Sequence, residues 1–132
     1  MRAIWFVVLC ACGMTRGESL SETIRVYNDN MRWERFPVAA IHVPAAQRSQ
    51  FVDEADARAK DVKITDYEIV RVDRKGHAAK VHVKLSWYRE SEGMLHETQA
   101  MQTWEQHGKA WMIVDETRLR GTEMPGLPEA LK

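Results

Sequence analysis

The feature that most constrains this chain is a change in its hydrophobic period near Val62, from helical spacing to strict alternation. The clearest alternating segment spans Ala78–Arg89. One face carries Ala79, Val81, Val83, Leu85 and Trp87, and the other carries Lys80, His82, Lys84, Ser86 and Tyr88. Because successive side chains of a strand point to opposite faces, this pattern predicts a strand with one buried face.

Three further segments with the same period predict strands at residues 63–73, 95–106 and 110–118. Short turns at residues 74–77, 92–93 and 107–109 separate them, and each turn contains a glycine. Connections this short join antiparallel neighbours, so we expect a four-stranded meander. A two-residue turn at His107-Gly108 would place Trp104 opposite Trp111 on one face. A three-residue turn would place them on opposite faces, and the pattern leaves this register open.

Helical spacing before Val62 predicts helices at residues 20–36 and 45–61. Ser19 and Glu22 have the spacing of a capping box, Pro37 is expected to end the first helix, and Pro44 lies where proline opens the second. Residues 37–43 fit either a helical turn or a short strand. Helices followed by strands predict an α+β domain at residues 19–120, with the helices on one face of the sheet. An irregular tail follows at residues 121–132.

The order of these elements and the closing segment TWEQHGKAWMIV (residues 103–114) resemble the NTF2-like (cystatin-like) superfamily. Its members often finish with an aromatic residue, a short glycine-containing turn and Trp-X-Ile. The stretch DVKITDYEI (residues 61–69) is similar to small envelope proteins of that type, many of them uncharacterised. The resemblance implies helices packed on a curved sheet around a cone-shaped cavity.

The resemblance alone leaves the activity open, because this fold hosts both isomerases and non-catalytic binding modules. Isomerase-type members use a carboxylate base and a phenol or acid that stabilises an oxyanion. The groups available for these roles here are Asp66, Asp115, Tyr27, Tyr67 and Tyr88. None of them stands in a spacing that singles it out.

Composition excludes several classes of protein. The 19 basic and 19 acidic residues cancel, so the chain offers no broad basic surface for nucleic acid. The five histidines are scattered and the two cysteines, Cys10 and Cys12, lie near the N-terminus, so we expect no metal and no other cofactor. There is also no glycine-rich phosphate loop and no Gly-X-Ser-X-Gly motif.

The N-terminal segment has the form of a bacterial lipoprotein signal. Arg2 precedes an apolar run at residues 3–9 that is too short to span a bilayer. The run Leu9-Cys10-Ala11-Cys12 fits a lipobox, which predicts a signal peptide at residues 1–11, lipid attachment at Cys12 and a tether at residues 12–18. Cys10 fits the pattern less well, and Ala11-Cys12-Gly13 resembles an ordinary signal peptidase site. A buried N-terminal helix or strand is the remaining alternative.

If Cys12 is acylated, the resemblance to bacterial lipoproteins implies a diacylglyceryl thioether, usually with an added N-acyl group. Stable anchoring requires more than one acyl chain, which this modification supplies. In Gram-negative bacteria a glycine at the position of Gly13 favours export to the outer membrane. The expected location is therefore the bacterial envelope, at the outer membrane and facing the periplasm.

Aromatic residues are the remaining candidates for a binding surface. Trp residues are numerous for a domain of this size, and core packing is the simpler interpretation of them. The alternative is that some of them line a pocket or a partner-binding face. The candidates for such a surface are Tyr27, Trp33, Tyr67, Trp87, Trp104 and Trp111.

These observations favour a lipid-anchored envelope protein that acts as a non-catalytic binding or assembly module. Its partner would be an envelope protein or an apolar small molecule. The alternative is a small-molecule-binding or isomerase-like enzyme that uses the cavity, and a subunit of a larger complex is a third possibility. An open cavity with a buried carboxylate near a tyrosine would support the second hypothesis, whereas a cone filled by side chains would contradict it.

Overall fold

The computed structural model describes residues 19–131, so the expected signal peptide, the tether before Ser19 and Cys12 lie outside the described residues. The helices are α1 (Leu20–Arg32), α2 (Phe36–Ala39) and α3 (Arg48–Ala59), with 3-10 turns at Ala40–His42 and Ala45–Gln47. The strands are β1 (Val62–Lys75), β2 (Ala78–Arg89), β3 (Leu95–His107) and β4 (Ala110–Gly121). Among the described helices, none is long and apolar enough to cross a membrane.

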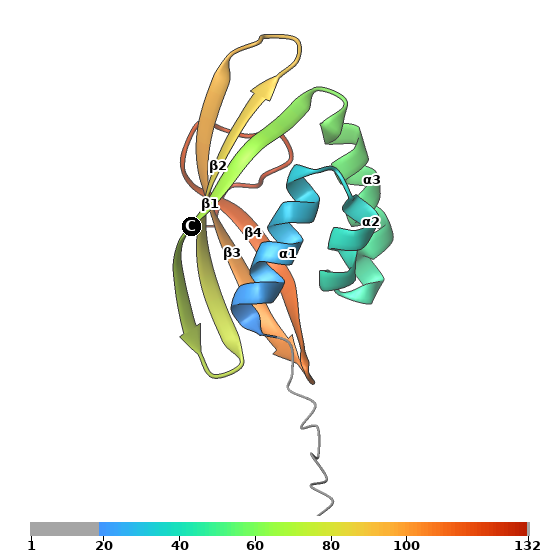
Figure 1. Ribbon diagram of the computed structural model, residues 1–132, viewed down its shortest axis with the longest axis vertical. Helices are drawn as coiled ribbons and strands as arrows, with labels where there is room; N and C mark the ends of the chain where they lie inside the picture. The colour runs from blue at the N-terminus through green and yellow to red at the C-terminus, as the bar shows by residue number, and fades with distance from the viewer. Residues whose placement is uncertain (1–18, 132) are drawn as a thin grey trace, which may run out of the picture.

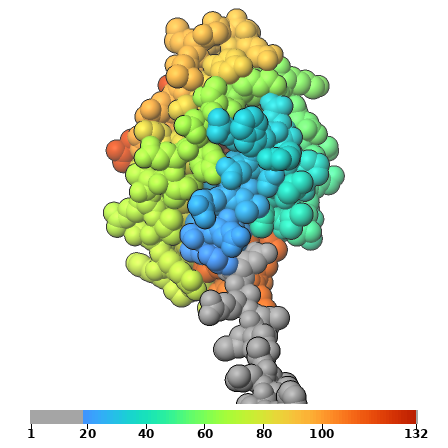
Figure 2. All heavy atoms as spheres, viewed as in Figure 1, coloured from blue at the N-terminus to red at the C-terminus, as the bar shows by residue number. Residues whose placement is uncertain are grey.

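The strands form one antiparallel sheet in the order β1-β2-β3-β4, and the helices cover one face of it (Figure 1). The sheet is strongly curved, and α1 lies in its hollow (Figure 1). Figure 2 shows the atoms of α1 (blue) between those of β1 (yellow-green) and those of α2 (cyan). The expected α+β architecture, with helices followed by a four-stranded meander, is confirmed.

Alternation determines which face of the sheet is buried. In β2 the predicted bounds and the predicted inward face are both confirmed, and its five apolar inward residues are all buried. Trp87, Trp104 and Trp111 are almost fully buried and form the centre of the core together with Ile24 of α1. Each large aromatic side chain removes a large apolar area from water, so these residues dominate the packing energy.

The turn between β3 and β4 settles the register that the sequence left open. His107 pairs with Ala110, so the turn consists of Gly108 and Lys109. Gly108 has a φ of 64°, a conformation that glycine adopts without steric cost. Trp104 therefore pairs with Ile113, and Trp111 lies two residues further along the same face.

The first helix ends earlier than predicted, at Arg32 instead of residue 36. The amide of Glu34 donates to the carbonyl of Met31 (3.2 Å) and the amide of Arg35 donates to that of Asn30 (2.8 Å). These two bonds form a Schellman motif with Glu34 in the left-handed region, at a φ of 59°. The motif closes the helix before Pro37 is reached, and Pro37 instead lies in the first turn of α2.

In the helical region the structure also corrects one expectation and resolves one ambiguity. Ser19 is the N-cap of α1, but its side chain makes no capping bond and instead lies 3.4 Å from the hydroxyl of Ser21. The capping box predicted from Ser19 and Glu22 is therefore absent. Residues 37–43, which fitted a helical turn or a strand, are helical up to His42.

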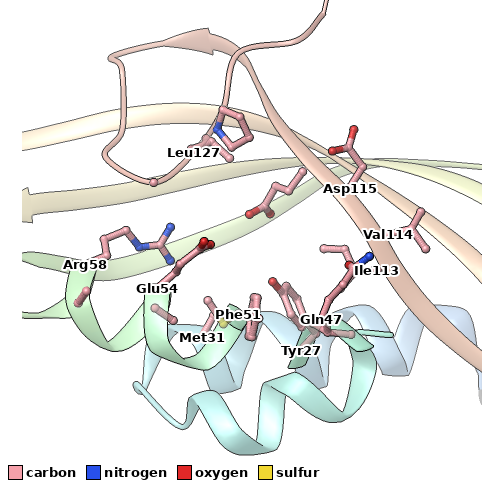
Figure 3. Close-up of a pocket in the computed structure, with 16 residues that line it drawn as sticks. Tyr27, Met31, Gln47, Phe51, Glu54, Arg58, Ile113, Val114, Asp115 and Leu127 are labelled. Carbon is pink, nitrogen blue, oxygen red and sulfur yellow. The ribbon is translucent and has the colours of Figure 1, made fainter. Parts of the chain in front are cut away.

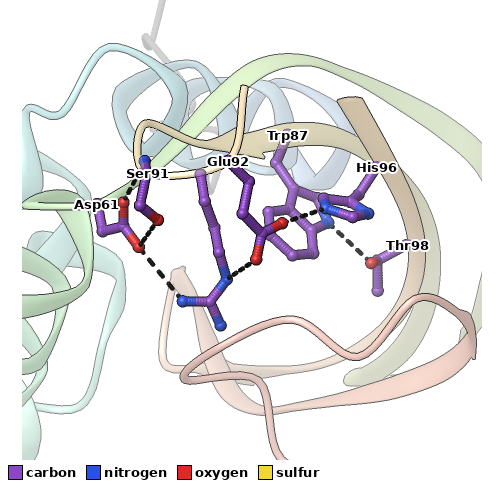
Figure 4. A network of polar contacts seen from close by, with 7 residues as sticks. Asp61, Trp87, Ser91, Glu92, His96 and Thr98 are labelled. Carbon is purple, nitrogen blue, oxygen red and sulfur yellow. Dashed lines mark hydrogen bonds and ion pairs between the residues drawn. The ribbon is translucent and has the colours of Figure 1, made fainter. Parts of the chain in front are cut away.

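A polar network joins the β2–β3 connection to the turn that follows α3 (Figure 4). The Asp61 carboxylate accepts hydrogen bonds from the amide of Ser91 (3.0 Å), the hydroxyl of Ser91 (3.1 Å) and Nη1 of Arg89 (3.3 Å). These bonds, led by that of the Ser91 amide, lower the pKa of Asp61. Nearby, the His96 ring packs on Trp87 with centroids 4.6 Å apart. These contacts hold the β2–β3 connection against the turn that follows α3.

Candidate ligand-binding cavity

A cavity of about 410 Å³ lies between the helices, β4 and the C-terminal tail (Figure 3). Its lining is mainly apolar, with a few charged groups contributed by α3 and β4. The lining residues are Tyr27, Met31, Val43, Gln47, Phe51, Glu54, Ala55, Ala57, Arg58, Ile113, Val114, Asp115, Glu116, Gly126, Leu127 and Pro128. The cone that the resemblance implied is therefore hollow at this end.

A β-bulge in β4 brings a glutamate into the inward row of this strand. Trp104 of β3 pairs with Ile113, and the preceding residue, Thr103, pairs with Asp115, so Val114 is an extra residue in β4. An extra residue reverses the alternation of the strand beyond it. Glu116 consequently pairs with the buried Gln102, in the inward row that also contains Ile113.

Among the described residues, only one oxygen of the Glu116 carboxylate accepts a hydrogen bond. Gln102 Nε2 donates to Glu116 Oε2 at 2.6 Å, and no described residue forms a hydrogen bond with Glu116 Oε1. Burial raises the pKa of Glu116, and the charge of Asp115 raises it further. The Gln102 hydrogen bond and the charge of Arg58 act in the opposite direction. Because Glu116 lines the cavity, its second oxygen is available to a bound molecule.

Two neighbours, Trp104 and Asn28, fix the orientation of the Gln102 side chain. Trp104 Nε1, which can only donate, lies 3.2 Å from Gln102 Oε1. Asn28 Nδ2 donates to the same oxygen (3.3 Å), and Gln102 Nε2 donates to Asn28 Oδ1 (2.9 Å). Asn28 is itself anchored to the Ile24 carbonyl (2.8 Å). The amide nitrogen of Gln102 must therefore face Glu116, and it donates to the carboxylate.

Tyr27 supplies a second polar group to the cavity. Its side chain reaches from α1 toward β4 (Figure 3), with its ring edge-on to Trp104 at 5.5 Å and tilted against Phe51 at 6.3 Å. The residue is 3% exposed, and its hydroxyl has no hydrogen-bond partner among the described residues. Burial, and then the nearby charge of Glu116, raise its pKa well above the ordinary value. The hydroxyl thus stays protonated and can donate to a ligand.

The mouth of the cavity carries charged side chains from α3 and β4. Glu54 and Arg58 project from α3 toward the hollow, and Asp115 lies on β4 (Figure 3). Arg58 forms no ion pair with any described residue and acts on Glu116 through its charge alone. With Glu116 the lining holds three carboxyl groups and one guanidinium.

The C-terminal tail covers one side of the cavity. Leu127 is 8% exposed and belongs to the core, although residues 121–132 were expected to be irregular. Arg118 holds this segment through two hydrogen bonds to Glu129, at 2.6 and 2.9 Å, and its amide donates to the Pro128 carbonyl at 2.8 Å. The tail is therefore irregular in backbone but packed in place.

The structure separates the six aromatic candidates. Tyr27 lines the cavity, whereas Trp87, Trp104 and Trp111 are core residues outside its lining. Trp33 is 60% exposed and stacks under the Arg32 guanidinium. The Tyr67 hydroxyl donates to Asp29 Oδ1 at 2.6 Å, and burial followed by this hydrogen bond raises the pKa of Tyr67 to about 12.

The candidate acids and the remaining tyrosine are distributed similarly. Asp115 lines the cavity as an exposed rim residue. Asp66 lies outside the lining, 3.8 Å from Arg32, and Tyr88 also lies outside it. The inward carboxylate is Glu116, which strict alternation from Trp111 and Ile113 assigns to the outer face. A bulge leaves no clear mark in the hydrophobic pattern, so only the pairing register reveals this residue.

The site contains no arrangement of metal ligands. Among residues 19–131, no group of three or more His, Cys, Asp and Glu side chains could hold a metal ion. The ionisable groups of the cavity lining are its carboxyl groups, the Tyr27 phenol and the Arg58 guanidinium.

Three helices on a curved four-stranded antiparallel sheet, enclosing a cavity at one end, define the NTF2-like class of fold. A ketosteroid isomerase-like protein from Erwinia carotovora atroseptica has this fold and superposes with a TM-score of 0.60 at 11% identity, over 76% of this chain and 93% of that one. A SEC-C motif containing protein from Rhodopseudomonas palustris superposes with a TM-score of 0.66 at 13% identity, over 77% and 80%. A conserved protein from Planctomyces limnophilus gives 0.54 at 12%, over 73% and 88%.

These similarities show the fold alone, because the identities are low. No protein-family model matches the sequence, and no curated protein is a significant sequence match. The resemblance to the NTF2-like superfamily is thus supported at the level of fold.

Proposed function

We propose that this protein binds an apolar small molecule carrying one polar group in the cavity between α1, α3, β4 and the tail. The observation that carries the proposal is an open, largely apolar cavity containing two polar atoms, Glu116 Oε1 and the Tyr27 hydroxyl, that have no hydrogen-bond partner among residues 19–131. Ligand pockets commonly combine a volume of about 300–1,000 Å³ with a few convergent polar groups. The cavity has both properties.

Filling the cavity tests this proposal. Ala55 is a buried lining residue of α3, so Ala55→Phe places a ring in the hollow. Asp56→Phe adds the same ring at an exposed, non-lining position of the same helix and serves as the control. With the neutral probe N-phenylnaphthylamine, we expect fluorescence enhancement in the unaltered chain and in Asp56→Phe, and its loss in a folded Ala55→Phe variant. Equal enhancement in all three would exclude the cavity as the binding site.

A second candidate function is proton transfer at a carbon next to a carbonyl. It is favoured by the raised pKa of Glu116 beside the protonated Tyr27 hydroxyl, since a general base works best with a pKa near the operating pH. In such a reaction the Glu116 carboxylate removes the α-proton and Tyr27 donates a hydrogen bond to the enolate oxygen. The Glu116 carboxyl then returns the proton to carbon, which leaves the protein unchanged.

Deuterium exchange measures this activity directly. A phenylalkyl ketone is incubated with the protein in D2O, and the loss of its α-proton NMR signal is followed. We expect exchange with the unaltered chain and none above background with Glu116→Gln, because an amide cannot accept the proton. Equal exchange with both proteins would exclude Glu116 as the base and leave ligand binding as the function.

We also propose that the domain is anchored to the bacterial envelope through a lipid on Cys12. The support is the sequence Leu9-Cys10-Ala11-Cys12 behind a short apolar run. The tether that follows would hold the cavity close to the membrane surface, where apolar molecules are concentrated. An anchored binding module and a cavity for an apolar ligand are therefore compatible functions.

The two cysteines provide a matched test of the anchor. Cys12→Ala is expected to move the protein out of the membrane fraction and to abolish the mass added by the acyl chains. Cys10→Ala removes the neighbouring thiol and should leave both properties unchanged. If Cys12→Ala retains the membrane association and the mass of the unaltered protein, lipid attachment at this residue is wrong.

A further inference from the structure

Building on the proposed ligand cavity, we infer that its preferred ligand is a cation: an apolar body carrying a primary ammonium group, with Glu116 as its counter-ion. If the cavity binds no small molecule, this inference fails together with the proposed function. If the cavity binds neutral and charged molecules alike, the inference alone fails.

The cavity lining carries a net negative charge. Glu54 and Arg58 line the cavity from α3, Glu116 faces it from the inward row of β4, Asp115 lies on its exposed rim, and Tyr27 is the titratable group of α1. The lining segment of the tail, Gly126 to Pro128, carries no ionisable side chain. Three carboxyl groups, of which those of Glu54 and Asp115 belong to exposed residues, against one guanidinium give the lining a net negative charge, and this charge attracts cations.

The hydrogen bonds behind Glu116 satisfy one oxygen of its carboxylate. The Trp104 indole fixes the Gln102 amide so that its nitrogen donates to Glu116 Oε2. Oε2 is therefore an acceptor that is already satisfied, and Oε1 is an acceptor without a partner among the described residues. No described Lys, Arg or His lies within ion-pair distance of this carboxylate. A ligand ammonium supplies the donor that the protein omits.

Two aromatic residues form part of the cavity wall. The rings of Tyr27 and Phe51 lie side by side along the cavity, with centroids 6.3 Å apart (Figure 3). Aromatic faces attract ammonium groups as well as apolar bodies. Apolar residues such as Met31, Ile113 and Leu127 complete the surface against which an alkyl or aryl body would pack.

A series of three isosteric probes tests the inference with the full chain. Phenylbutylammonium, phenylbutanol and phenylbutyrate share one apolar body and differ in charge. At mildly alkaline pH we expect the ammonium to bind about tenfold more tightly than the alcohol, as measured by calorimetry, since a hydrogen bond to a charged group is worth that much. Glu116→Gln should remove this preference and leave the affinity for phenylbutanol unchanged. Glu97→Gln, the same change at an exposed residue of β3 outside the lining, should keep the preference.

Each of the other binding outcomes would overturn the inference. If phenylbutanol binds as tightly as the ammonium, the cavity binds apolar molecules but does not select cations. If phenylbutyrate binds most tightly, Arg58 is the anchoring group and the inference is overturned. Binding of none of the three would overturn the proposed function as well. If Glu116→Gln does not fold, lowering the pH of the unaltered protein replaces it, because protonating Glu116 should abolish the preference for the ammonium.

Discussion

The carboxyl group of Glu116 lies where water solvates it poorly. Burial is the largest cause of its raised pKa, and neither the hydrogen bond from Gln102 nor the charge of Arg58 fully compensates for it. The surroundings of Glu116 therefore disfavour its ionised form, and a bound cation would stabilise that form. Binding sites often retain such groups at the expense of stability.

A pH titration of stability tests this view of Glu116. A carboxyl whose pKa is raised by folding binds more protons in the folded chain than in the unfolded one, so its contribution to stability falls as pH rises above its ordinary pKa. Glu116→Gln removes this loss. We expect the variant to be the more stable protein at neutral pH by about 1.4 kcal/mol for each unit of pKa shift. The difference should vanish below the ordinary glutamate pKa.

Urea unfolding at a series of pH values measures the difference between the two proteins. Asp61, whose pKa is lowered by folding, contributes stability that is lost as pH falls, but it is present in both proteins and cancels in the comparison. A difference that is independent of pH would show that Glu116 titrates normally.

At the scale of elements, β4 is shaped by the irregularities along its length. Val114 is an extra residue between the partners of Thr103 and Trp104, and Leu119 is an extra residue between those of Gln99 and Ala100. The strand ends at Gly121, which has a φ of 89° and packs against the backbone of β3. Bulges bend a strand and increase its twist, and the chain continues from Gly121 into the tail.

Gly121→Ala should be among the more damaging small substitutions in the protein. An added Cβ would lie 2.7 Å from the Glu97 carbonyl oxygen, and the backbone at both positions resists movement. Gly76→Ala is the matched control, because Gly76 also has a positive φ, of 61°, but nothing lies within 4 Å of an added Cβ. We expect Gly76→Ala to cost about 1 kcal/mol and Gly121→Ala at least about twice that, as measured by urea unfolding. Equal losses would mean that the β4 backbone relaxes freely.

The sequence allowed most of the elements to be predicted because their signals are local. Alternation located all four strands, and the bounds of β2 were predicted correctly. The end of α1 was misplaced because Glu34 adopts the left-handed conformation usually taken by glycine, which the sequence does not indicate.

The candidate site was predicted less completely because it depends on register. Tyr27 was identified among the aromatic residues, and Asp115 among the acids, and both line the cavity. Glu116 was missed, because one unpaired residue at Val114 places it on the inward side of the strand. Pairing of this kind is set by tertiary packing across β3 and β4, which no local pattern records.

At the scale of the whole molecule, the tail connects the sheet to the opening of the cavity. Arg118 and Glu129 tie it down, and Leu127 packs into the core while lining the hollow. Gly126 approaches Arg58 of α3 so closely that an added Cβ would lie 3.1 Å from its Cδ. A ligand that enters near the tail therefore meets a segment held by a few polar contacts.

Loosening the tail should change exchange kinetics more than stability. Glu129→Ala removes an exposed ion pair, which costs at most about 1 kcal/mol. We expect faster hydrogen exchange at the Leu127 amide, which donates to the Met124 carbonyl, and faster dissociation of N-phenylnaphthylamine. Glu123→Ala alters a tail residue for which no hydrogen bond is present among the described residues, and it should leave both rates unchanged. Unchanged rates in Glu129→Ala would show that the tail does not control entry.

The bridge between Arg118 and Glu129 also bears on how copies of this chain behave at high concentration. β4 is an edge strand, and an uncovered edge offers its free amides and carbonyls to a strand of another molecule. The tail runs parallel to β4 at this point, and the Arg118 amide is already bonded to Pro128. The segment that covers the cavity therefore also covers the edge of β4 at Arg118, and we expect removal of the tail to expose more of this edge to strands of other molecules.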